Sequence, residues 1–247
     1  TMGSQTHPEF APPADACDAH IHIFSQHFPM AAGDTRVIAD ASVEDYGLLQ
    51  QRLGTSRVVV VQPSTYGTDN RCLVEALARF GAVARGIAVV DTSVTDEALK
   101  QTENWLQTDE ALKRLGAAGV RGIRFNIARA GATRVDMIEA LAQRIAPLGW
   151  HVQIHMEADG IAQHAALWER LPVPIVFDHM GRIPARDSTA HPAFAVLRRL
   201  LQRGQAWVKL SGAYVVSAQG APAYADVATL AQALHQVRPD RMLWGSD

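Results

Sequence analysis

Eight short apolar segments alternate with longer amphipathic ones along this sequence, and this alternation constrains the fold more than any other feature. Each apolar segment is rich in valine, isoleucine or an aromatic residue and is short enough for a strand buried on both faces. The segments are 16–24, 57–62, 84–90, 120–125, 151–156, 174–179, 207–211 and 241–244. Their starts lie roughly 25 to 40 residues apart, which leaves room for one helix and two loops between successive strands.

The stretches between these segments carry helical patterns. Apolar residues recur at spacings of three and four in 43–53, 70–80, 134–148, 161–171, 194–201 and 224–237. Ser42 and Asp69 are suitable N-caps for the first two helices, and Gly54 and Gly81 are suitable ends. Strands that alternate with helices pair in parallel, and a count of eight favours a closed (β/α)8 barrel, the TIM barrel, over an open doubly wound sheet.

The domain boundaries follow from the same patterns. Residues 1–13 show no apolar periodicity, so we expect a lead-in that starts with the remnant of a tag at 1–4, and a single barrel domain over 14–247. The sequence stops on the eighth strand, so we expect the final outer helix to be absent from it and these residues to be part of a longer chain. The hexapeptide at 95–100 recurs at 108–113, which we interpret as a short duplication that lengthens the third helix.

Composition excludes several classes of protein. Lys and Arg number 23 against 25 Asp and Glu, which is not the charge pattern of a nucleic-acid-binding protein. The longest apolar runs, such as Val58–Val61, are too short to span a bilayer. Cys17 and Cys72 give no disulfide framework, and no signal-peptide pattern precedes them. We therefore expect a cytoplasmic protein without nucleic-acid or membrane partners, and the oligomeric state stays open.

Polar side chains gather where the predicted strands end, which is where TIM barrels build their active sites. His20 and His22 are two residues apart on the first strand and so face the same side. His155 ends the fifth strand, His179 the sixth and Asp247 the eighth. Burying four imidazoles and a carboxylate at one mouth would be costly without a use, because buried polar groups need partners. We therefore favour an active site over a set of satisfied core histidines.

Other polar residues near the predicted strand ends have a more ordinary interpretation. Lys209 is expected to pair with a carboxylate inside the barrel, and Asp178 to face the helix layer. His151 lies at the start of the fifth strand and is expected to be structural, and Glu157 is left without a role. Ser211 and Tyr214 follow the seventh strand and are also left unassigned.

These strand-end motifs resemble the amidohydrolase-2 branch of the amidohydrolase superfamily, over about residues 15–247. The resemblance is carried by Asp-Ala-His-Ile-His-Ile-Phe at 18–24, Arg-Gly-Ile-Arg-Phe-Asn at 121–126, Trp-Gly-Ser-Asp at 244–247, and the segments 61–70, 85–91 and 174–182. It implies a TIM-barrel hydrolase that opens a small carboxylated lactone in the catabolism of aromatic or sugar acids. A lactone like 2-pyrone-4,6-dicarboxylate, a muconolactone or a sugar-acid lactone would fit.

The resemblance also implies catalytic roles at the mouth. Asp247 would be the general base that takes a proton from the attacking water. His20, His22 and His179, or a metal that they help to hold, would polarise the lactone carbonyl and stabilise the oxyanion.

Substrate binding is implied for a second group of residues. Arg124 and Arg182 would bind substrate carboxylates, because a guanidinium matches a carboxylate with two parallel hydrogen bonds. A salt bridge at the barrel rim is the alternative for Arg124, and a solvated loop charge is the alternative for Arg182. The orienting hydrogen bonds would come from Ser64, Tyr66 and Asn126.

A metal site is the sharpest expectation. Three imidazoles and a carboxylate suit zinc or manganese, and metal-dependent members of the family use this arrangement, which would correspond here to His20, His22, His155 and Asp247. His155 stands where metal-free lactonases have a tyrosine, and Arg124 stands where binuclear members have a lysine, so one divalent ion is expected. A metal-free histidine cluster is the alternative. A metal-dependent decarboxylase, a lactone isomerase and an inactive ligand-binding barrel also stay open as functions.

Overall fold

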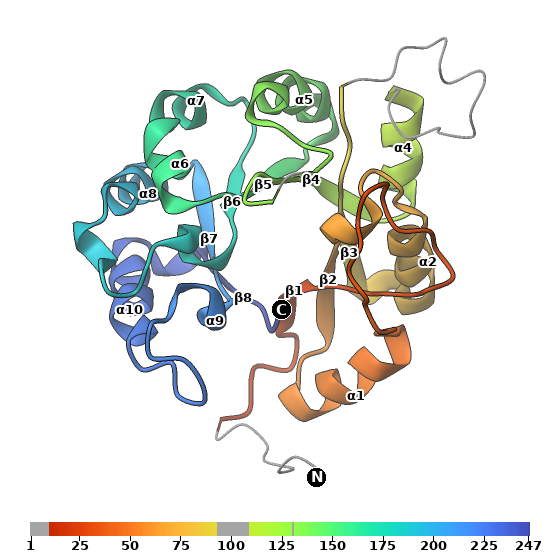
Figure 1. The fold of residues 1–247 in the computed structure, drawn as a ribbon, viewed down its shortest axis with the longest axis horizontal. Coiled ribbons are helices and arrows are strands. Elements are labelled where there is room, and N and C mark those ends of the chain that lie inside the picture. Colours follow the sequence, from red (N-terminus) through yellow and green to blue (C-terminus); the bar gives the residue numbers. More distant parts are fainter. Residues whose placement is uncertain (1–9, 93–108, 130) are drawn as a thin grey trace.

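The computed structural model describes residues 10–92, 109–129 and 131–247. Eight parallel strands pair in chain order and curl into a nearly closed ring (Figure 1), so the predicted TIM barrel is confirmed. The strands are β1 (Cys17–Ile21), β2 (Arg57–Val61), β3 (Ala84–Ala88), β4 (Val120–Asn126), β5 (His151–His155), β6 (Ile175–Phe177), β7 (Ala206–Leu210) and β8 (Met242–Trp244). Beyond β8, the backbone N–H of Asp247 donates to the carbonyl oxygen of His20 at 2.8 Å, which joins the end of the last strand to the first.

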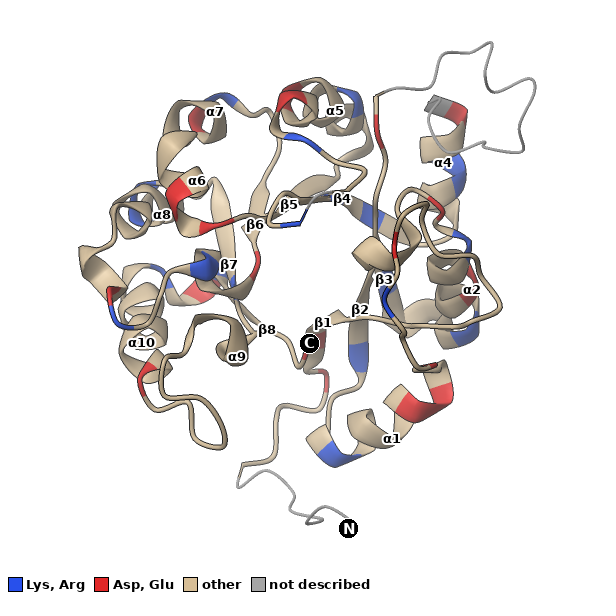
Figure 2. Cartoon of the chain, in the orientation of Figure 1, with Lys and Arg blue, Asp and Glu red and all other residues tan. Residues whose placement is uncertain are grey.

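Helices surround the ring, and Figure 2 shows charged residues of both signs spread over them. They are α1 (Val43–Leu53), α2 (Arg71–Phe80), α4 (Asp109–Ala117), α5 (Ile138–Ile145), α6 (Ala158–Gln163), α7 (Ala165–Arg170), α8 (Pro192–Gln202), α9 (Ala213–Val216) and α10 (Val227–Val237). Among the described residues, none of the helices combines the length and apolar character needed to cross a membrane.

Two of the expected helices are divided in the structure, and the repeated hexapeptide and the lead-in lie partly outside the described residues. The stretch 134–148 forms α5 between two short 3₁₀ turns, and 161–171 is broken at His164, whose backbone (φ −98°, ψ 23°) leaves the helical conformation. Residues 109–113 of the second copy of the repeated hexapeptide lie within α4, whereas its first copy and residues 1–9 of the expected lead-in are outside the described residues. The short helix α9 carries no sequence signal that we used.

The helix ends follow the expected chemistry in three of four cases. Ser42 and Asp45 form a reciprocal capping box at α1, with bonds of 2.9 and 3.1 Å, and Gly54 ends that helix at φ +75°. Gly81 ends α2. The cap position of α2 is Asn70 and not the expected Asp69, although the Asp69 carboxylate accepts a hydrogen bond from the backbone N–H of Arg71 at 3.1 Å. The Asn70 amide is buried and exchanges two hydrogen bonds with the backbone of Val89, at 2.9 and 3.0 Å.

The side chains of the strands divide into two layers. Val152 and Ile154 of β5 join the apolar core between strands and helices, where the rings of Trp168 and Phe177 also meet at 5.7 Å. Gln153, between them, points into the ring and accepts a hydrogen bond from Lys209 at 2.8 Å. The barrel is therefore held together by an apolar outer layer, and its interior is polar.

His151 has the structural position expected for it, and it makes the fold sensitive to acid. Burial, together with the charge of Lys209, lowers the pKa of His151 to about 4 from the ordinary 6.5. The unfolded chain therefore binds more protons between these two pH values. We expect His151 alone to lower the free energy of unfolding by about 2 to 3 kcal/mol as the pH drops from 6.5 to 4. Urea unfolding measured across this pH range should show a smaller loss of unfolding free energy for His151→Gln than for the wild type. Equal losses in the two proteins would contradict the lowered pKa of His151.

Candidate active site

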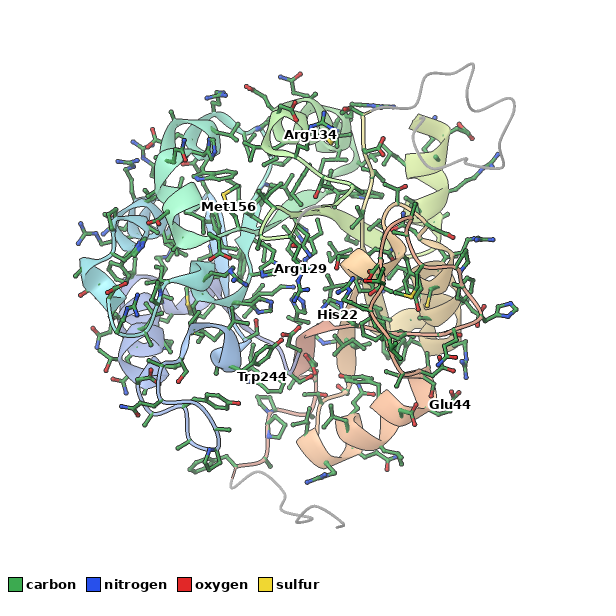
Figure 3. The ribbon with its side chains drawn as sticks, in the orientation of Figure 1. His22, Glu44, Arg129, Arg134, Met156 and Trp244 are labelled. Atoms are coloured by element: carbon green, nitrogen blue, oxygen red, sulfur yellow. The ribbon has the colours of Figure 1, made fainter. Side chains whose placement is uncertain are left out.

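The candidate site lies at the mouth of the ring, where the carboxyl ends of the strands meet. Figure 3 shows His22 and Arg129 at this central opening, and the chain ends there as well (Figure 1). Asp247 is the hub of the site. Its carboxylate lies 3.4 Å from His20 Nε2, 3.5 Å from His22 Nε2 and 3.8 Å from His179 Nε2. The structure therefore brings together four of the five predicted groups.

Close packing at the ends of β1 and β8 fixes this hub. Asp18 is buried and accepts hydrogen bonds from the backbone N–H and the hydroxyl of Ser246, at 2.9 and 2.5 Å. Gly245 lies so close to β1 that a Cβ at this position would approach the Cβ of His20 to 2.6 Å. Gly245 and Ser246 of the Trp-Gly-Ser-Asp motif thus let the backbone pass close to β1, and this brings Asp247 over His20.

A strained turn after β6 positions His179 and Arg182. The residues from His179 to Arg182 have φ values of 50°, 54°, 64° and 51°, and three of the four are not glycine. Such a left-handed run costs roughly 1–2 kcal/mol for each non-glycine residue and is typical of functional sites. His179 Nδ1 is held by Ser211 Oγ at 2.9 Å, and a Cβ at Gly212 would meet the same nitrogen at 2.6 Å.

This turn also explains why the expectation for Asp178 is wrong. Phe177 is the last residue of β6 and faces the helices, so Asp178 points into the ring and not towards the helix layer. There it accepts hydrogen bonds from Arg124 Nε at 3.0 Å and from Gln153 Nε2 at 3.2 Å. The left-handed turn then interrupts the alternation of the strand and directs the next residue, His179, back to the mouth.

Lys209 lies beneath the hub and confirms its expected pairing inside the barrel. Its Nζ is 3.7 Å from Asp178 Oδ1 and 3.1 Å from His20 Nδ1. Burial lowers the pKa of Lys209 to about 8. Burial alone would raise the pKa of Asp178, but the charges of Arg124 and of the neighbouring cations lower it well below its usual range. The floor of the site is therefore a buried network of two cations and one carboxylate.

The electrostatics of the mouth favour neutral imidazoles around an ionised carboxylate. Burial lowers the pKa of His20 and of His179, and it lowers the pKa of His155 to about 3. Burial acts in the opposite direction on Asp247, but the hydrogen bond with His22 and the nearby imidazoles lower its pKa overall. At neutral pH, Asp247 can accept a proton and the imidazoles can offer lone pairs.

Three of these groups could hold a metal ion. Ligand atoms of His20, His179 and Asp247 all lie within 4.8 Å of one another. His20 Nε2 is buried without a hydrogen-bond partner among the described residues, which is the state expected of a nitrogen available for a ligand. His22 is close by, and its Nδ1 is held by the carbonyl oxygen of Val61 at 2.8 Å, so its Nε2 faces Asp247. The donor set therefore fits a divalent ion.

The His155 ring packs edge-on against His179, with centroids 5.1 Å apart, but its nitrogens do not join the cluster of possible ligand atoms around Asp247. Its Nδ1 lies 3.0 Å from Asn126 Oδ1, and its Nε2 lies 3.0 Å from Arg182 Nη1. Arg182 also donates to Glu157 at 2.6 Å. Asn126 and Arg182, both predicted to bind substrate, therefore meet through His155 at the β4–β6 side of the mouth.

The remaining predicted substrate residues have protein partners. Arg124 forms a salt bridge with Asp178, as in its alternative interpretation, but the pair is buried inside the barrel and does not lie at the rim. The hydroxyl of Tyr66 accepts from the backbone N–H of Ser25 at 2.8 Å and donates to its carbonyl at 3.0 Å. The hydroxyl of Ser64 accepts from Arg36 at 3.1 Å. Roles of these three residues in substrate binding stay predictions.

Sequence reasoning missed one residue that touches the hub. Tyr214, on α9, donates its hydroxyl proton to Asp247 Oδ2 at 2.5 Å. Burial and this bond raise the pKa of Tyr214 to about 12, so the phenol stays protonated. Its position after β7 was visible in the sequence, but only the backward turn of α9 shows that it reaches the carboxylate.

Comparisons with known proteins identify the family of this chain. A model of the amidohydrolase family matches residues 17–247. A 2-pyrone-4,6-dicarboxylate hydrolase of Comamonas testosteroni is 36% identical over 97% of this chain and 78% of its own length. A 4-sulfomuconolactone hydrolase of Rhizobium radiobacter is 32% identical over 96% of this chain and 77% of its own. A ligand-free crystal structure from Agrobacterium tumefaciens, 28% identical, superposes with a TM-score of 0.85 over 97% of this chain and 84% of its own.

Proposed function

The chain belongs to the amidohydrolase family and is a hydrolase, and from this premise we propose that it opens the ring ester of a small lactone that carries carboxylate groups. The observation that supports this most is the ionised carboxylate of Asp247 beside three imidazoles at the barrel mouth. Lactone opening needs an activated water, a polarised carbonyl and a proton relay, and this cluster can supply all three. The 2-pyrone-4,6-dicarboxylate hydrolase and the 4-sulfomuconolactone hydrolase act on lactones with acidic substituents, and Arg182 near the site could bind such a group.

The proposed reaction assigns a distinct task to each residue at the hub. Asp247 takes a proton from water as the water oxygen attacks the lactone carbonyl, and it returns that proton to the ring oxygen as the ester bond breaks. His179, held by Ser211, faces the developing oxyanion together with His22. The hydrogen bond from Tyr214 keeps the base oriented towards the substrate.

We also propose that one divalent ion, zinc or manganese, binds at the hub. His20, His179 and Asp247 would hold it, with His22 within reach of the same carboxylate. His179 would then be a ligand and would no longer face the oxyanion directly, because its other nitrogen is held by Ser211. A bound ion would polarise the carbonyl and make a bound water more acidic. A fourth ligand from His155, as the sequence suggested, would require its Nε2 to leave Arg182.

The metal proposal predicts a measurable stoichiometry. Protein purified without chelator should contain close to one zinc or manganese per chain by elemental analysis, and His20→Gln should lose it, because the orphaned Nε2 would be replaced by a weaker ligand. His164→Gln, at a histidine on the outer surface between α6 and α7, serves as the matched control and should keep the ion. Full activity after exhaustive chelation, with no metal detected, would show that the polar groups act on the lactone directly.

The proposed function is tested by a lactone panel on the full-length protein. We expect acid release, followed with a pH indicator, from carboxylated lactones and much slower release from neutral lactones of the same ring size. A preference for neutral lactones would contradict the proposed substrate class, and turnover without acid release would indicate an isomerase.

A further inference from the structure

We infer that His155 is a positioning residue that holds Arg182 in place to receive a substrate carboxylate, and that it is not a metal ligand. The inference rests on the proposed function for the identity of the carboxylate as part of a lactone. His155 Nε2 can bind a metal or accept a hydrogen bond from Arg182, but it cannot do both at once.

The hydrogen bonds of His155 settle which nitrogen carries its proton. A guanidinium has only donors, so the 3.0 Å contact between Arg182 Nη1 and His155 Nε2 requires that Nε2 accept. The proton therefore lies on Nδ1, which donates it to Asn126 Oδ1 at 3.0 Å. Both nitrogens are occupied in this arrangement, and a metal would have to displace Arg182.

The surroundings of His155 keep it in this neutral form. The ring is only 7% exposed, and both Arg124 and Arg182 bring positive charge near it. Protonation of Nε2 would set its N–H against the N–H of Arg182. The neutral imidazole is thus a fixed acceptor, with Asn126 fixing its tautomer from the other side.

Arg182 is held on two sides and has an unsatisfied donor between them. Nη1 is bound by His155, and Nη2 donates to Glu157 at 2.6 Å. Its Nε is buried and has no hydrogen-bond partner within the part of the chain that the structure describes. A buried N–H without a partner is unfavourable, and an anionic oxygen would satisfy it.

The strained backbone supports the same assignment. Arg182 has φ +51° and ends the left-handed turn that also positions His179. One turn therefore carries a group for the reacting carbonyl and a cation for a carboxylate, at a fixed separation. This pair would recognise a lactone whose carboxylate is attached close to the ester group.

Two variants at His155 separate positioning from metal ligation. In His155→Gln the amide oxygen can still accept from Arg182, whereas His155→Phe keeps a ring but offers no acceptor. Isophthalate, a planar dicarboxylate that cannot be hydrolysed, is the binding probe, with titration calorimetry as the readout. We expect His155→Phe to weaken isophthalate binding about tenfold and to raise KM for carboxylated lactones by a similar factor. His155→Gln should stay within about threefold of wild type.

Further measurements make each failure distinguishable. Metal content should be unchanged in both variants, and in an Arg182→Met background His155→Phe should weaken binding no further, since coupled residues are not additive. Loss of the metal in either variant, or equal isophthalate binding by wild type and His155→Phe, would overturn the inference. If wild type binds isophthalate in a His155-dependent way but hydrolyses no lactone, the proposed function fails and the positioning role stands.

Discussion

Asp247→Asn is expected to lower kcat by a factor of about a hundred or more while leaving the fold intact. The amide is nearly the same size as the carboxylate and can keep the backbone contact to β1, but it cannot accept a proton from water. The loss should appear in kcat, because the base acts in the transition state and not in substrate binding. Steady-state kinetics on the best lactone of the panel, with circular dichroism to check the fold, measure it.

A matched variant controls for the substitution itself. Asp136→Asn makes the same change at an exposed residue outside the ring, where the aspartate pairs with Arg134 at 3.1 Å. Exposed ion pairs contribute little, so this variant should behave as wild type. Activity of Asp247→Asn within a few-fold of wild type would remove Asp247 from the mechanism.

Asp178→Asn is expected to lower the free energy of unfolding by about 3 to 5 kcal/mol. Asp178 is fully buried between Arg124 and Lys209, and it is the carboxylate that balances both charges on the barrel floor. Asparagine keeps the size and some hydrogen bonds but leaves two buried cations without a counter-charge. Equilibrium unfolding in urea at neutral pH measures the loss.

A double variant tests whether charge is the cause. Removing one cation as well, in Asp178→Asn with Lys209→Met, should recover at least about half of the lost stability, because the remaining imbalance is smaller. If the double variant is less stable than Asp178→Asn alone, packing and not charge dominates at this site. A loss below about 1 kcal/mol in the single variant would contradict the buried network.

Local patterns were enough to predict the fold from the sequence. Each strand coincides with a run of apolar residues that needs no distant information, and Ser42 and Gly54 mark the ends of α1 by their own backbone preferences. The cap position of α2 lies one residue later than expected, at Asn70, whose side chain is fixed by bonds with Val89, just beyond β3. Contacts between residues distant in the sequence are what short-range patterns do not encode.

The same distinction separates the site residues that could be predicted from those that could not. The rule that barrel sites lie at strand ends was enough to find His20, His22 and Asp247, because each lies at the carboxyl end of a predicted strand or just beyond it. Asp178 was misplaced because a left-handed turn follows β6 and interrupts the alternation of the strand. Tyr214 was not assigned because its contact depends on how α9 folds back over the mouth.

His155 illustrates a further limit. Its place at the end of β5 was predicted, but its partners depend on which way the ring and the guanidinium of Arg182 turn. Ligation of a metal and acceptance of a hydrogen bond use the same nitrogen, so sequence position alone does not choose between them.

Turnover of a carboxylated lactone in water enriched with heavy oxygen tests the central claim most directly. If Asp247 activates water to attack the ring carbonyl, mass spectrometry should find one labelled oxygen in the new carboxylate of the product, with every carbon of the substrate retained. Product without label, or product that has lost carbon dioxide, would contradict hydrolysis and indicate an isomerase or a decarboxylase.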